Sequence, residues 1–513
     1  IRRMAGAGQQ REARPLLAAY LRQRPDDFDL TLMAADLARQ AHDAPAALAA
    51  AKSALALRPL AAKAHLQLGN ALRAAKRLPE ARAALEEAVR LDPGMPGPRN
   101  NLGVVLKELG DLPGSIVQYR AVLAGEPDSL SARANLGNAL RDSGEFVESE
   151  ACFRTLLARH PDNPEYWYGL GNTLKEAAQF AAAIDAYRQG LAVKPDHSDL
   201  KVNLSLMLLL TGQLGEGWDM YEERFLRPER PVPARPWRMP RWDGGALRGR
   251  RLLLWGEQGV GDRIMFARLL PRLGAAPGQV TVETDRRLLR LMERNFPSVE
   301  WFAETTPPRP PAAQSSAPPA LQAPMGALAR HFTRSTADFD DGGPYLTADP
   351  ALAAAWRKRL GAAAGRRVGF VWAGNPEHAN DRNRSLPLDA LRPLWSLPGI
   401  DGISLQLGPQ AAQVAECGAP LKDVADGIRD FEDTAALLAC LDLVITVDTS
   451  VAHLAGALGV PAWVLLPFSP DWRWMTEFEA TTPWYRSLRL YRQHVWRDWG
   501  DPLARMAKAL AAA

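Results

Sequence analysis

The sequence predicts an α-helical solenoid followed by α/β domains with parallel sheets. Two ladders of residues, one of prolines and one of glycines, repeat every 34 positions through the first part of the chain and indicate the solenoid. After a proline-dense segment at 228–241, short apolar runs of strand length alternate with helical stretches, as in parallel sheets with crossover helices. A chain of 513 residues is too long for one ordinary core, so two or three domains are expected.

The two ladders have the same period and a fixed offset. The prolines are Pro25, Pro59, Pro93, Pro127, Pro161 and Pro195, and the glycines are Gly69, Gly103, Gly137 and Gly171. Small residues follow twelve positions after the glycines (Ala81, Ser115, Ser149, Ala183), and large ones four positions later (Leu85, Tyr119, Phe153, Tyr187). Small residues let two antiparallel helices approach, the large residue fills the gap, and the proline ends the second helix. This pattern is typical of tetratricopeptide repeats, so we predict about six repeats over 1–227, ending in a divergent cap at 198–226.

A row of side-chain amides accompanies the glycine ladder. Two residues before the glycines stand Gln67, Asn101, Asn135 and Gly169; Asn203 continues the register, and Asn70, Asn138 and Asn172 follow the glycines. On the concave face of an array, stacked amides can hydrogen-bond an extended peptide without reading its sequence. The alternative is that asparagine simply fits these helix positions and meets water. We take Asn101, Asn135 and Asn203 as a candidate acceptor groove.

Two segments are too rich in proline or too low in complexity for regular structure. The segment "PERPVPARPWRMPR" at 228–241 excludes a long helix and marks a domain boundary, so we predict a linker at 228–246. The segment "TTPPRPPAAQSSAPPA" at 305–320 is predicted to be a surface loop.

The rest of the chain is predicted to form two Rossmann-like α/β domains, at 247–345 and 346–513. Predicted strands lie at 251–255, 279–283, 366–372, 402–408, 441–448 and 461–467. A helix is predicted at 262–273, directly after the first strand. Two such domains face each other across a cleft, and ligands bind these sheets at the carboxyl ends of the strands.

The first candidate site is the turn "WGEQGVGD" at 255–262. Its glycines are Gly256, Gly259 and Gly261, which allow positive φ and a close approach of backbone to ligand. The acid that follows, Asp262, is well placed to accept a proton, although it also fits a helix N-cap. The glycine spacing differs from the dinucleotide fingerprint, but Glu283 lies about 20 residues further on at a strand end, so a dinucleotide site stays an alternative.

The second candidate site lies in "DLVITVDTSVAHLAGALGVPAWVLLP", residues 442–467. A buried strand ends at Asp448, Thr449 and Ser450, a helix begins there, and His453 lies one turn into it. Hydroxyls and backbone N–H groups at a helix N-terminus form an anion site suited to a diphosphate. His453 can donate to a phosphate or sugar oxygen; the alternative is a helix histidine whose hydrogen bonds are satisfied within the protein.

The third candidate site is the loop at 371–388. It holds Gly374, Asn375, His378, Asp381, Arg382, Arg384 and Ser385. Arg384 is the best candidate for neutralising a leaving diphosphate because guanidinium matches phosphate geometry. The alternative is a solvated basic loop.

Two further positions complete the predicted donor site. Gln406 ends the strand predicted at 402–408, and Asp433 with Thr434 opens a helix that would border the nucleotide end of the cleft. Helix capping is the alternative role of Asp433.

Charge and composition argue against several classes of protein. The net charge of +4 is too weak and too spread to indicate nucleic-acid binding. There is no apolar run of about 18 residues and no signal-peptide pattern. The three cysteines, Cys152, Cys417 and Cys440, lack metal-site spacing and suggest reduced, buried thiols in a cytoplasmic protein. No metal-ligand cluster or Walker A loop is present, so neither metal nor cofactor is predicted. The chain begins at Ile1 within a repeat pattern, which suggests a missing N-terminal piece.

These motifs carry a family resemblance over about residues 250–500. The second half resembles a glycosyltransferase of the GT-B type and is similar to the ADP-heptose:lipopolysaccharide heptosyltransferases. "DTSVAH" at 448–453 resembles that family's D-T-G-x-x-H donor motif, with Ser450 where the family has glycine. "GVGD" at 259–262 resembles the family's glycine turn, which implies that Asp262 is the catalytic base. Around "RNRSLP" the family carries a donor-phosphate lysine, and the matching charge here is Arg384.

The arrangement of the whole chain resembles bacterial tetratricopeptide–glycosyltransferase fusions and is similar in plan to the O-GlcNAc transferases. The segments "LLPFSPDWRWM" and "PWYRSLRLYRQ" look typical of the bacterial fusions. The resemblance implies an inverting, metal-independent hexosyl- or heptosyltransferase that uses a nucleotide-sugar and takes a protein or peptide acceptor from the array. The alternatives are a tetratricopeptide scaffold with a vestigial or ligand-sensing α/β half, and an NAD-dependent enzyme that uses the turn at 256–262. The motifs name neither the sugar, the nucleotide nor the acceptor, because they contact phosphates that all donors share.

Overall fold

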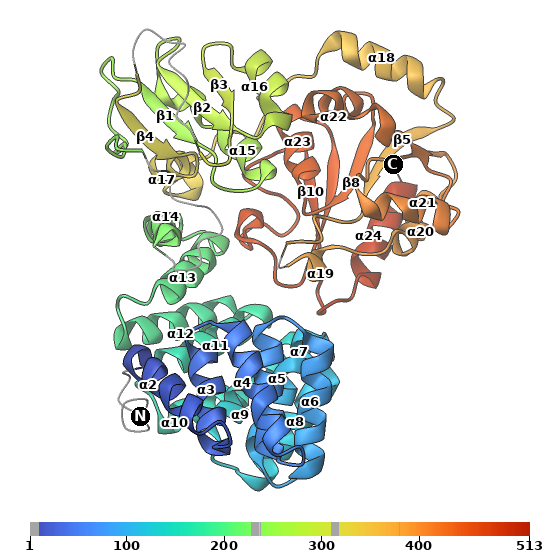
Figure 1. Ribbon diagram of the computed structural model, residues 1–513. Coiled ribbons are helices and arrows are strands. Elements are labelled where there is room, and N and C mark those ends of the chain that lie inside the picture. Colours follow the sequence, from blue (N-terminus) through green and yellow to red (C-terminus); the bar gives the residue numbers. More distant parts are fainter. Residues whose placement is uncertain (1–9, 227–234, 236, 309–317, 379, 513) are drawn as a thin grey trace. The chain divides into compact units, whose positions relative to one another are not determined.

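The computed structural model describes residues 10–226, 235, 237–308, 318–378 and 380–512. The chain divides into two compact units, Ile1–Pro195 and Asp196–Ala513 (Figure 1). The first is entirely helical where it is described, and the second contains two parallel sheets. The predicted fold class, a helical solenoid followed by α/β domains, is confirmed.

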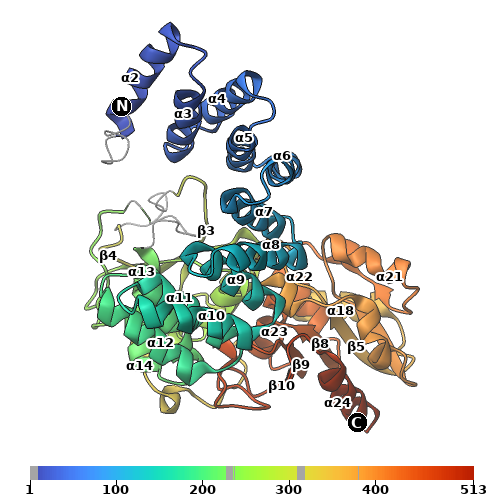
Figure 2. The same cartoon turned by 90° about the horizontal axis from the view of Figure 1, so that it is seen from below.

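The first unit is a series of antiparallel helix pairs, which Figure 2 shows following one another along the chain. Its helices are α2 (Gln10–Gln23), α3 (Phe28–Gln40), α4 (Ala44–Leu57), α5 (Ala62–Ala74), α6 (Leu78–Leu91), α7 (Pro96–Glu108), α8 (Leu112–Gly125), α9 (Leu130–Ser143), α10 (Phe146–Arg159), α11 (Pro164–Glu176) and α12 (Phe180–Val193). Each ladder proline from Pro25 to Pro195 lies in the turn after the second helix of a pair, as predicted.

The glycine ladder marks where a large side chain of the next helix fills the space that a Cβ atom would need. A Cβ on Gly103 would lie 2.6 Å from the Tyr119 ring, and one on Gly171 would lie 2.3 Å from the Tyr187 ring. The Phe153 ring fills two such spaces, since a Cβ on Gly169 would lie only 2.1 Å from it and one on Gly137 2.9 Å. This contact explains why Gly169 interrupts the row of amides: the ring leaves no room for an asparagine side chain.

The predicted cap of the solenoid belongs to the second unit. Residues 198–226 form α13 (Ser198–Leu210), α14 (Leu214–Tyr221) and η1 (Glu222–Phe225). The Trp218 ring packs edge-on against Trp472 at 5.2 Å, and the carbonyl of Leu210 accepts a hydrogen bond of 2.8 Å from the amide of Thr476. The compact unit therefore begins at Asp196 rather than at the predicted boundary of 227, because these helices bury aromatic surface against the α/β region.

The first sheet is parallel, with the strand order β3-β2-β1-β4. Its strands are β1 (Leu252–Trp255), β2 (Val280–Thr284), β3 (Glu300–Ala303) and β4 (Leu321–Pro324), and its helices are α15 (Val260–Ala267), α16 (Leu289–Asn295) and α17 (Ala327–Phe332). Strands β3 and β4 were not predicted. Most of the proline-rich part of the linker, 228–234 and 236, and the middle of the predicted loop, 309–317, lie outside the described residues.

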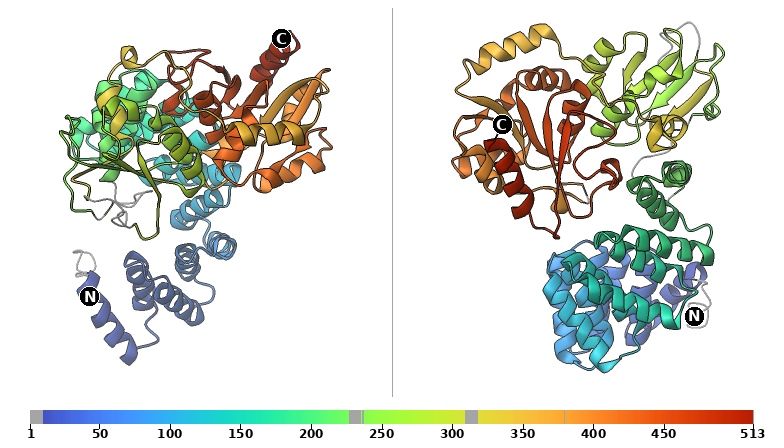
Figure 3. Two further views of the ribbon diagram at one scale, coloured as in Figure 1. Left: turned by 90° about the horizontal axis from the view of Figure 1, so that it is seen from above. Right: turned by 180° about the vertical axis from the view of Figure 1, so that it is seen from behind.

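The second sheet is also parallel, with the order β10-β9-β8-β5-β6-β7. Its strands are β5 (Arg366–Val371), β6 (Ile400–Ser404), β7 (Lys422–Asp423), β8 (Leu443–Val447), β9 (Ala462–Leu466) and β10 (Leu488–Arg492). The helices include α18 (Pro350–Leu360), α19 (Asp381–Arg384), α20 (Arg392–Trp395), α21 (Gln413–Glu416), α22 (Phe431–Leu438), α23 (Ser450–Leu458) and α24 (Gly500–Ala511). In the right-hand view of Figure 3, α24, drawn in dark red, lies against this sheet, where Leu503, Met506 and Leu510 join the core of β5 and β8. The strand predicted at 402–408 runs over 400–404 instead, and β7 and β10 were not predicted.

The packing of Phe153 generates a stability prediction. Replacing this ring by a methyl group leaves two glycines facing an empty space, so Phe153→Ala is expected to lower the free energy of unfolding by about 3–5 kcal/mol. Val147→Ala on the same helix α10 is the matched control, because Val147 is 87% exposed. Urea unfolding of the full chain followed by circular dichroism measures both; equal transitions for the two variants would refute the packing role of Phe153.

Candidate active site

The predicted motifs lie at the topological switch points of the two sheets, one motif in the first sheet and two in the second. In the first sheet β1 lies between β2 and β4, and the glycine turn follows β1. In the second sheet β5 and β8 are neighbours whose connections run to opposite sides, and Asp448 follows β8 while Gly374 follows β5. Loops diverge at such points and leave a crevice at the carboxyl ends of the strands, where ligands bind. All three predicted motifs therefore occupy positions suited to a ligand.

The glycine turn and the 448–453 motif meet through the first turns of α15 and α23. A Cβ atom on Gly261 would lie 2.7 Å from the Cδ2 of His453 and 3.4 Å from the Cα of Ser450. A Cβ atom on Gly261 would therefore force the His453 ring or the backbone to shift, whereas one on Gly256 would meet only the movable guanidinium end of Arg263, at 2.6 Å. None of the three turn glycines uses the positive φ that glycine allows; Gly259 is the N-cap of α15 with φ −61°.

Asp262 is the third residue of α15 and not its N-cap, which is Gly259, but its carboxylate forms a hydrogen bond with the backbone of Gly259 at the start of the helix. The residue is 8% exposed, and its Oδ1 accepts a hydrogen bond of 2.6 Å from the Nε of Arg473. Burial raises the pKa of Asp262 above its ordinary value, and the charge of Arg473 opposes that shift. A buried carboxylate in the first turn of the helix that follows β1 has the location and the shifted pKa that a general base requires.

Arg473 is a residue of this site that the sequence did not single out. It lies in η8 (Trp472–Trp474), and its guanidinium donates to Asp262, to Asp471 and, at 2.7 Å, to Gln258. The signal that could have found it is its place in the loop after β9, whose carboxyl end lies beside that of β8.

The helices α14 and η1 contribute to the surroundings of the glycine turn. Tyr221 accepts a hydrogen bond from the amide of Gln258, and Arg224 donates one of 2.6 Å to the buried carboxylate of Glu257. Arg224 lies 4.1 Å above the rings of both Tyr221 and Phe225. The last helix pair with repeat character therefore borders the turn that carries Asp262.

The predicted phosphate-binding end of the site is formed by Asp448, Thr449 and Ser450. Thr449 is the N-cap of α23, but its side chain does not cap the helix and instead pairs with the hydroxyl of Thr446 at 3.0 Å. The first turn of α23 therefore keeps backbone N–H groups without a side-chain cap, as an anion site requires. Burial and the nearby Asp471 carboxylate raise the pKa of Asp448 to about 6.

His453 is buried beside both motifs. Its Nδ1 lies 3.1 Å from the hydroxyl of Tyr485, and its ring stacks on Trp474 at 5.2 Å. Burial, together with the positive charge of Arg473, lowers the pKa of His453 to about 3, so the imidazole is neutral at physiological pH. The structure thus makes His453 a neutral hydrogen-bonding group rather than a cation.

Arg384 links the 371–388 loop to the end of β8. Its guanidinium donates to the carbonyl of Asp448 at 3.0 Å and lies 3.5 Å from the carboxylate of Asp381. The hydroxyl of Ser385 accepts from the amide of Gly374 at 2.9 Å and donates to Asp381 at 2.8 Å, which holds the loop closed. Arg384 therefore lies beside the predicted anion site, with Ser385 and Gly374 as its support.

Three other predicted residues, Asn375, Gln406 and Asp433, form hydrogen bonds within the protein. Asn375 is exposed and caps its own turn through a 3.1 Å bond from the amide of Glu377. The amide of Gln406 is buried two residues past the end of β6, where it accepts from the backbone of Trp372 and Ala373 and donates to Ala373 and Leu407. The structure thus uses Gln406 to hold the chain after β5.

Asp433 is likewise engaged within the protein. The N-cap of α22 is Asp430, so Asp433 does not cap the helix as the sequence suggested. Both of its carboxylate oxygens accept hydrogen bonds of 2.8 Å from Arg429. Thr434 bonds to the carbonyl of Asp430 at 3.1 Å.

The dinucleotide alternative depended on Glu283 as a ribose ligand. Glu283 ends in the core with no exposed surface, and its carboxylate accepts from Arg235 at 2.9 Å. An acid that is buried and paired in this way is not presented to a ribose, which argues against a dinucleotide site at this turn.

The amides of the array contact one another across neighbouring helices. The side chain of Asn101 on α7 donates to Asn70 on α5 at 2.7 Å, and that of Asn135 on α9 donates to Asn100 on α7 at 3.1 Å. Asn203 lies on α13, in the second unit, and donates to the carbonyl of Asp199 at 2.9 Å. The row is thus a connected set of half-buried amides over α5 to α9, and each amide keeps further hydrogen-bonding capacity.

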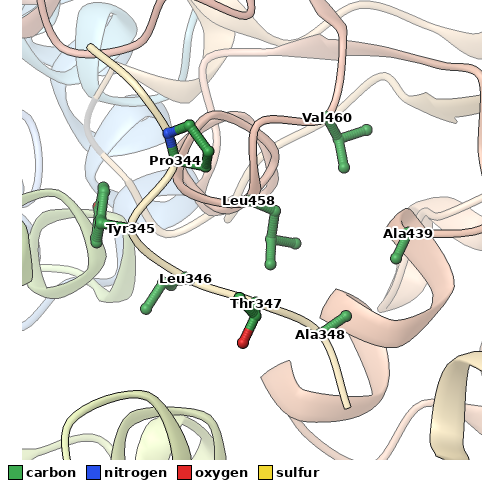
Figure 4. A pocket seen from close by; sticks show the side chains of 8 residues that line it. All are labelled: Pro344, Tyr345, Leu346, Thr347, Ala348, Ala439, Leu458 and Val460. Carbon is green, nitrogen blue, oxygen red and sulfur yellow. The ribbon is translucent and has the colours of Figure 1, made fainter. Parts of the chain in front are cut away.

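A pocket of ≈ 380 Å³ lies at the other end of α23 from the motif residues (Figure 4). It is lined by Pro344, Tyr345, Leu346, Thr347, Ala348, Ala439, Leu458 and Val460. Because Leu458 is the last residue of α23 and Ser450 the first, this pocket is separate from the predicted phosphate site.

The remaining predictions concern cysteines, metals and membranes. All three cysteines are free thiols; Cys152 is buried, as predicted, whereas Cys417 and Cys440 are half-buried. In the part of the chain that is described, no group of three or more His, Cys, Asp or Glu is arranged to hold a metal ion. Within the same residues, no helix has the length and apolarity needed to cross a membrane.

Models of known families match segments in both parts of the chain. Models of the tetratricopeptide repeat match residues 32–96 and 168–223, and residues 106–172. The model of glycosyltransferase family 9 (heptosyltransferase) matches residues 415–471. That segment includes β8, α23 and β9 and ends at Asp471, so it covers the 448–453 motif but neither Asp262 nor Arg384.

The chain is also similar to individual proteins. The chain is similar to Protein FlbA of Caulobacter vibrioides, with 32% identity over 323 residues, which is 60% of this chain and 54% of FlbA. The chain thus aligns with about half the length of this relative. Among solved structures it is similar to YrrB, a tetratricopeptide protein with an unusual peptide-binding site (21% identity, TM-score 0.30, 36% of this chain and 95% of YrrB). It is also similar to a tetratricopeptide repeat protein from Parabacteroides merdae (15% identity, TM-score 0.38, 43% of this chain and 87% of that one). The family matches together support a glycosyltransferase that carries a tetratricopeptide region.

Proposed function

We propose that this protein transfers a sugar from a nucleotide-sugar to a protein or peptide that the helical array recruits. The observation that carries the proposal is the convergence of a buried carboxylate, Asp262, with an anion site at the start of α23 through the contact of Gly261 with His453. Metal-independent sugar transfer requires two elements: a base that deprotonates the acceptor, and a site that stabilises the negative charge of the leaving phosphate.

The proposed reaction is a single displacement with inversion at the anomeric carbon. The acceptor hydroxyl gives its proton to Asp262 while its oxygen forms a bond to the anomeric carbon. The bond from that carbon to the donor phosphate oxygen breaks, and its electron pair stays on the phosphate. The departing phosphate is stabilised by Arg384, by the hydroxyls of Thr449 and Ser450 and by the N-terminal amides of α23, with neutral His453 as a further donor.

This chemistry needs no metal or cofactor, because Arg384 and the N-terminus of α23 supply the positive potential that a divalent cation would otherwise provide. The nucleotide-sugar is a co-substrate. The residues that surround the proposed phosphate position contact features common to all donors, so the donor is assigned here only by class.

The array supports the assignment of the acceptor as a protein or peptide. The connected amides of Asn70, Asn101, Asn100 and Asn135 offer the backbone-type donors and acceptors that bind an extended chain irrespective of its side chains. We place the reaction in the cytoplasm, where nucleotide-sugars and nascent proteins meet.

The first test is a search for the donor and for turnover. Thermal unfolding of the full chain is measured with UDP-, GDP-, ADP-, CMP- and dTDP-sugars, and the true donor is expected to raise the midpoint by mass action. Release of the nucleoside phosphate with that donor is then measured for Asp262→Asn, which should lower kcat by about 10²–10⁴ because the base is lost.

Asp426→Asn is the matched control, because the side chain of Asp426 is 80% exposed and pairs with Arg359, which lies outside the predicted motifs. No nucleoside phosphate release from any donor would refute the proposal. Unchanged turnover in Asp262→Asn would remove Asp262 as the base, and unchanged cellular function of that variant would favour the scaffold alternative.

A second prediction concerns Arg384. Arg384→Met should weaken donor binding by about 10–100-fold, because a charge-assisted hydrogen bond to phosphate is lost, and Arg384→Lys should lose less. The neighbouring Arg382→Met is the control, since Arg382 is exposed. Titration calorimetry measures all three; equal affinities in Arg384→Met and wild type would show that Arg384 serves only the loop.

A third prediction concerns the protonation state of His453. Since its pKa is lowered to about 3, His453 is deprotonated throughout pH 5–8, and its contribution should not change with pH in that range. His453→Gln should lower kcat/KM by about tenfold, by the same factor at every pH. The change of kcat/KM with pH that Asp448 causes, with its pKa of about 6, is present in both the wild type and His453→Gln. A loss that varies through pH 6–7 would contradict a neutral role, and His494→Gln, at an exposed position, is the control.

A further inference from the structure

Arg473 uses all three nitrogens of its guanidinium group in hydrogen bonds near the proposed site. Its Nε donates to Asp262 at 2.6 Å, one terminal nitrogen donates to Gln258 at 2.7 Å, and the other donates to Asp471. The guanidinium carbon lies 4.4 Å above the ring of Trp472, and the side chain is 15% exposed. These contacts join the first sheet to the second through one side chain, since Asp262 and Arg473 are 211 residues apart.

Arg473 acts on both halves of the proposed reaction centre. Besides its bonds to Asp262, its charge lowers the pKa of Asp448 and of His453, so it lies within electrostatic reach of the anion site at α23. A donor phosphate placed there adds negative charge to a region that already holds Asp448 and Asp471. The planar guanidinium is suited to a phosphate at least as well as to a carboxylate, because it offers two parallel N–H donors to either.

In the structure Arg473 binds Asp262, which is the group that must accept a proton in the proposed reaction. A carboxylate oxygen that receives the guanidinium at 2.6 Å is stabilised as the anion and has lost lone-pair capacity for an acceptor hydroxyl. Arg473 lowers the pKa of Asp262 through its charge and its hydrogen bond, so departure of the guanidinium raises that pKa further; burial and the charge of Asp471 still raise it, and the hydrogen bond with the backbone of Gly259 still lowers it. The same carboxylate is then both open and more basic.

We propose that Arg473 is a positioning residue that exchanges partners: without donor it holds Asp262, and the donor phosphate draws it away and so frees Asp262 for the acceptor. The proposal rests on the proposed function and adds to it an order of events, with the donor bound before the acceptor can be deprotonated. Asp262 and the phosphate compete for one guanidinium, and that competition is the measurable consequence.

Inorganic pyrophosphate is the probe for this competition, because it carries the phosphate chemistry without requiring the sugar or the base to be known. Its dissociation constant is measured by calorimetry on the full chain for wild type, Asp262→Asn, Arg473→Met and the double variant. Asp262→Asn should bind about tenfold more tightly, because it removes the competitor for the guanidinium, and Arg473→Met should bind at least about tenfold more weakly. In the Arg473→Met background, Asp262→Asn should have no effect.

The double variant separates exchange from simple charge. If Asp262→Asn tightens binding equally with and without Arg473, the gain comes from removing a negative charge and the proposal is overturned. Weaker binding in Asp262→Asn would also overturn it, because the ion pair would then serve to hold Arg473 in place. Arg473→Gln replaces Arg473→Met if the latter fails to fold, with the same expectation, and Asp426→Asn should leave the affinity unchanged.

Failure of this proposal and failure of the proposed function give different results. If sugar transfer is observed but Asp262 and Arg473 are not coupled, the proposed function stands and the exchange of partners is refuted. If Asp262 and Arg473 are coupled in pyrophosphate binding but no nucleotide-sugar is turned over, the exchange of partners stands and the transferase assignment is refuted.

Discussion

The candidate site depends on the close contact between the first turns of α15 and α23. That contact is possible because residue 261 has no side chain, so the ring of His453 and the backbone of Ser450 can approach it. A Cβ atom at 261 would clash with the His453 ring, so a larger residue would force the two turns or that ring to shift. The Asp262–Arg473 ion pair and the burial of His453 lie at this contact.

Burial at this contact determines the electrostatics of the site. It raises the pKa of Asp262 and of Asp448 and lowers that of His453, so that carboxylates hold protons more readily and the imidazole does not hold one. The positive charge is therefore provided by arginines, which stay charged when buried, and by helix amides. These are the electrostatic conditions that the proposed reaction needs: an anion site at α23, with a neutral histidine and a buried carboxylate beside it.

The helical part of the chain obeys the same steric rule as the site. Gly137 and Gly169 leave space for one ring, Phe153, as Gly261 leaves space for His453. The aromatic residues of α14, the last helix with repeat character, pack against the α/β region instead: Trp218 contacts Trp472, and Tyr221 accepts a hydrogen bond from Gln258. Helices that continue the repeat pattern of the array thus pack beside the glycine turn.

The sequence by itself determined the local periodicities: the 34-residue helical array, the parallel strand–helix alternation and the turns at strand ends that hold Asp262, Asp448 and Arg384. These follow from short-range spacing and from the rule that ligands meet parallel strands at their carboxyl ends. Strands β3, β4, β7 and β10 were not predicted, and β3, β4 and β7 are only two to four residues long and so carry little pattern. Only the tertiary structure decided which side chains are already engaged, as with Gln406 on the backbone after β5, Asp433 on Arg429 and Glu283 on Arg235. It alone brought Arg473 to Asp262, because a pairing across 211 residues depends on the folding of both sheets and leaves no trace in local spacing.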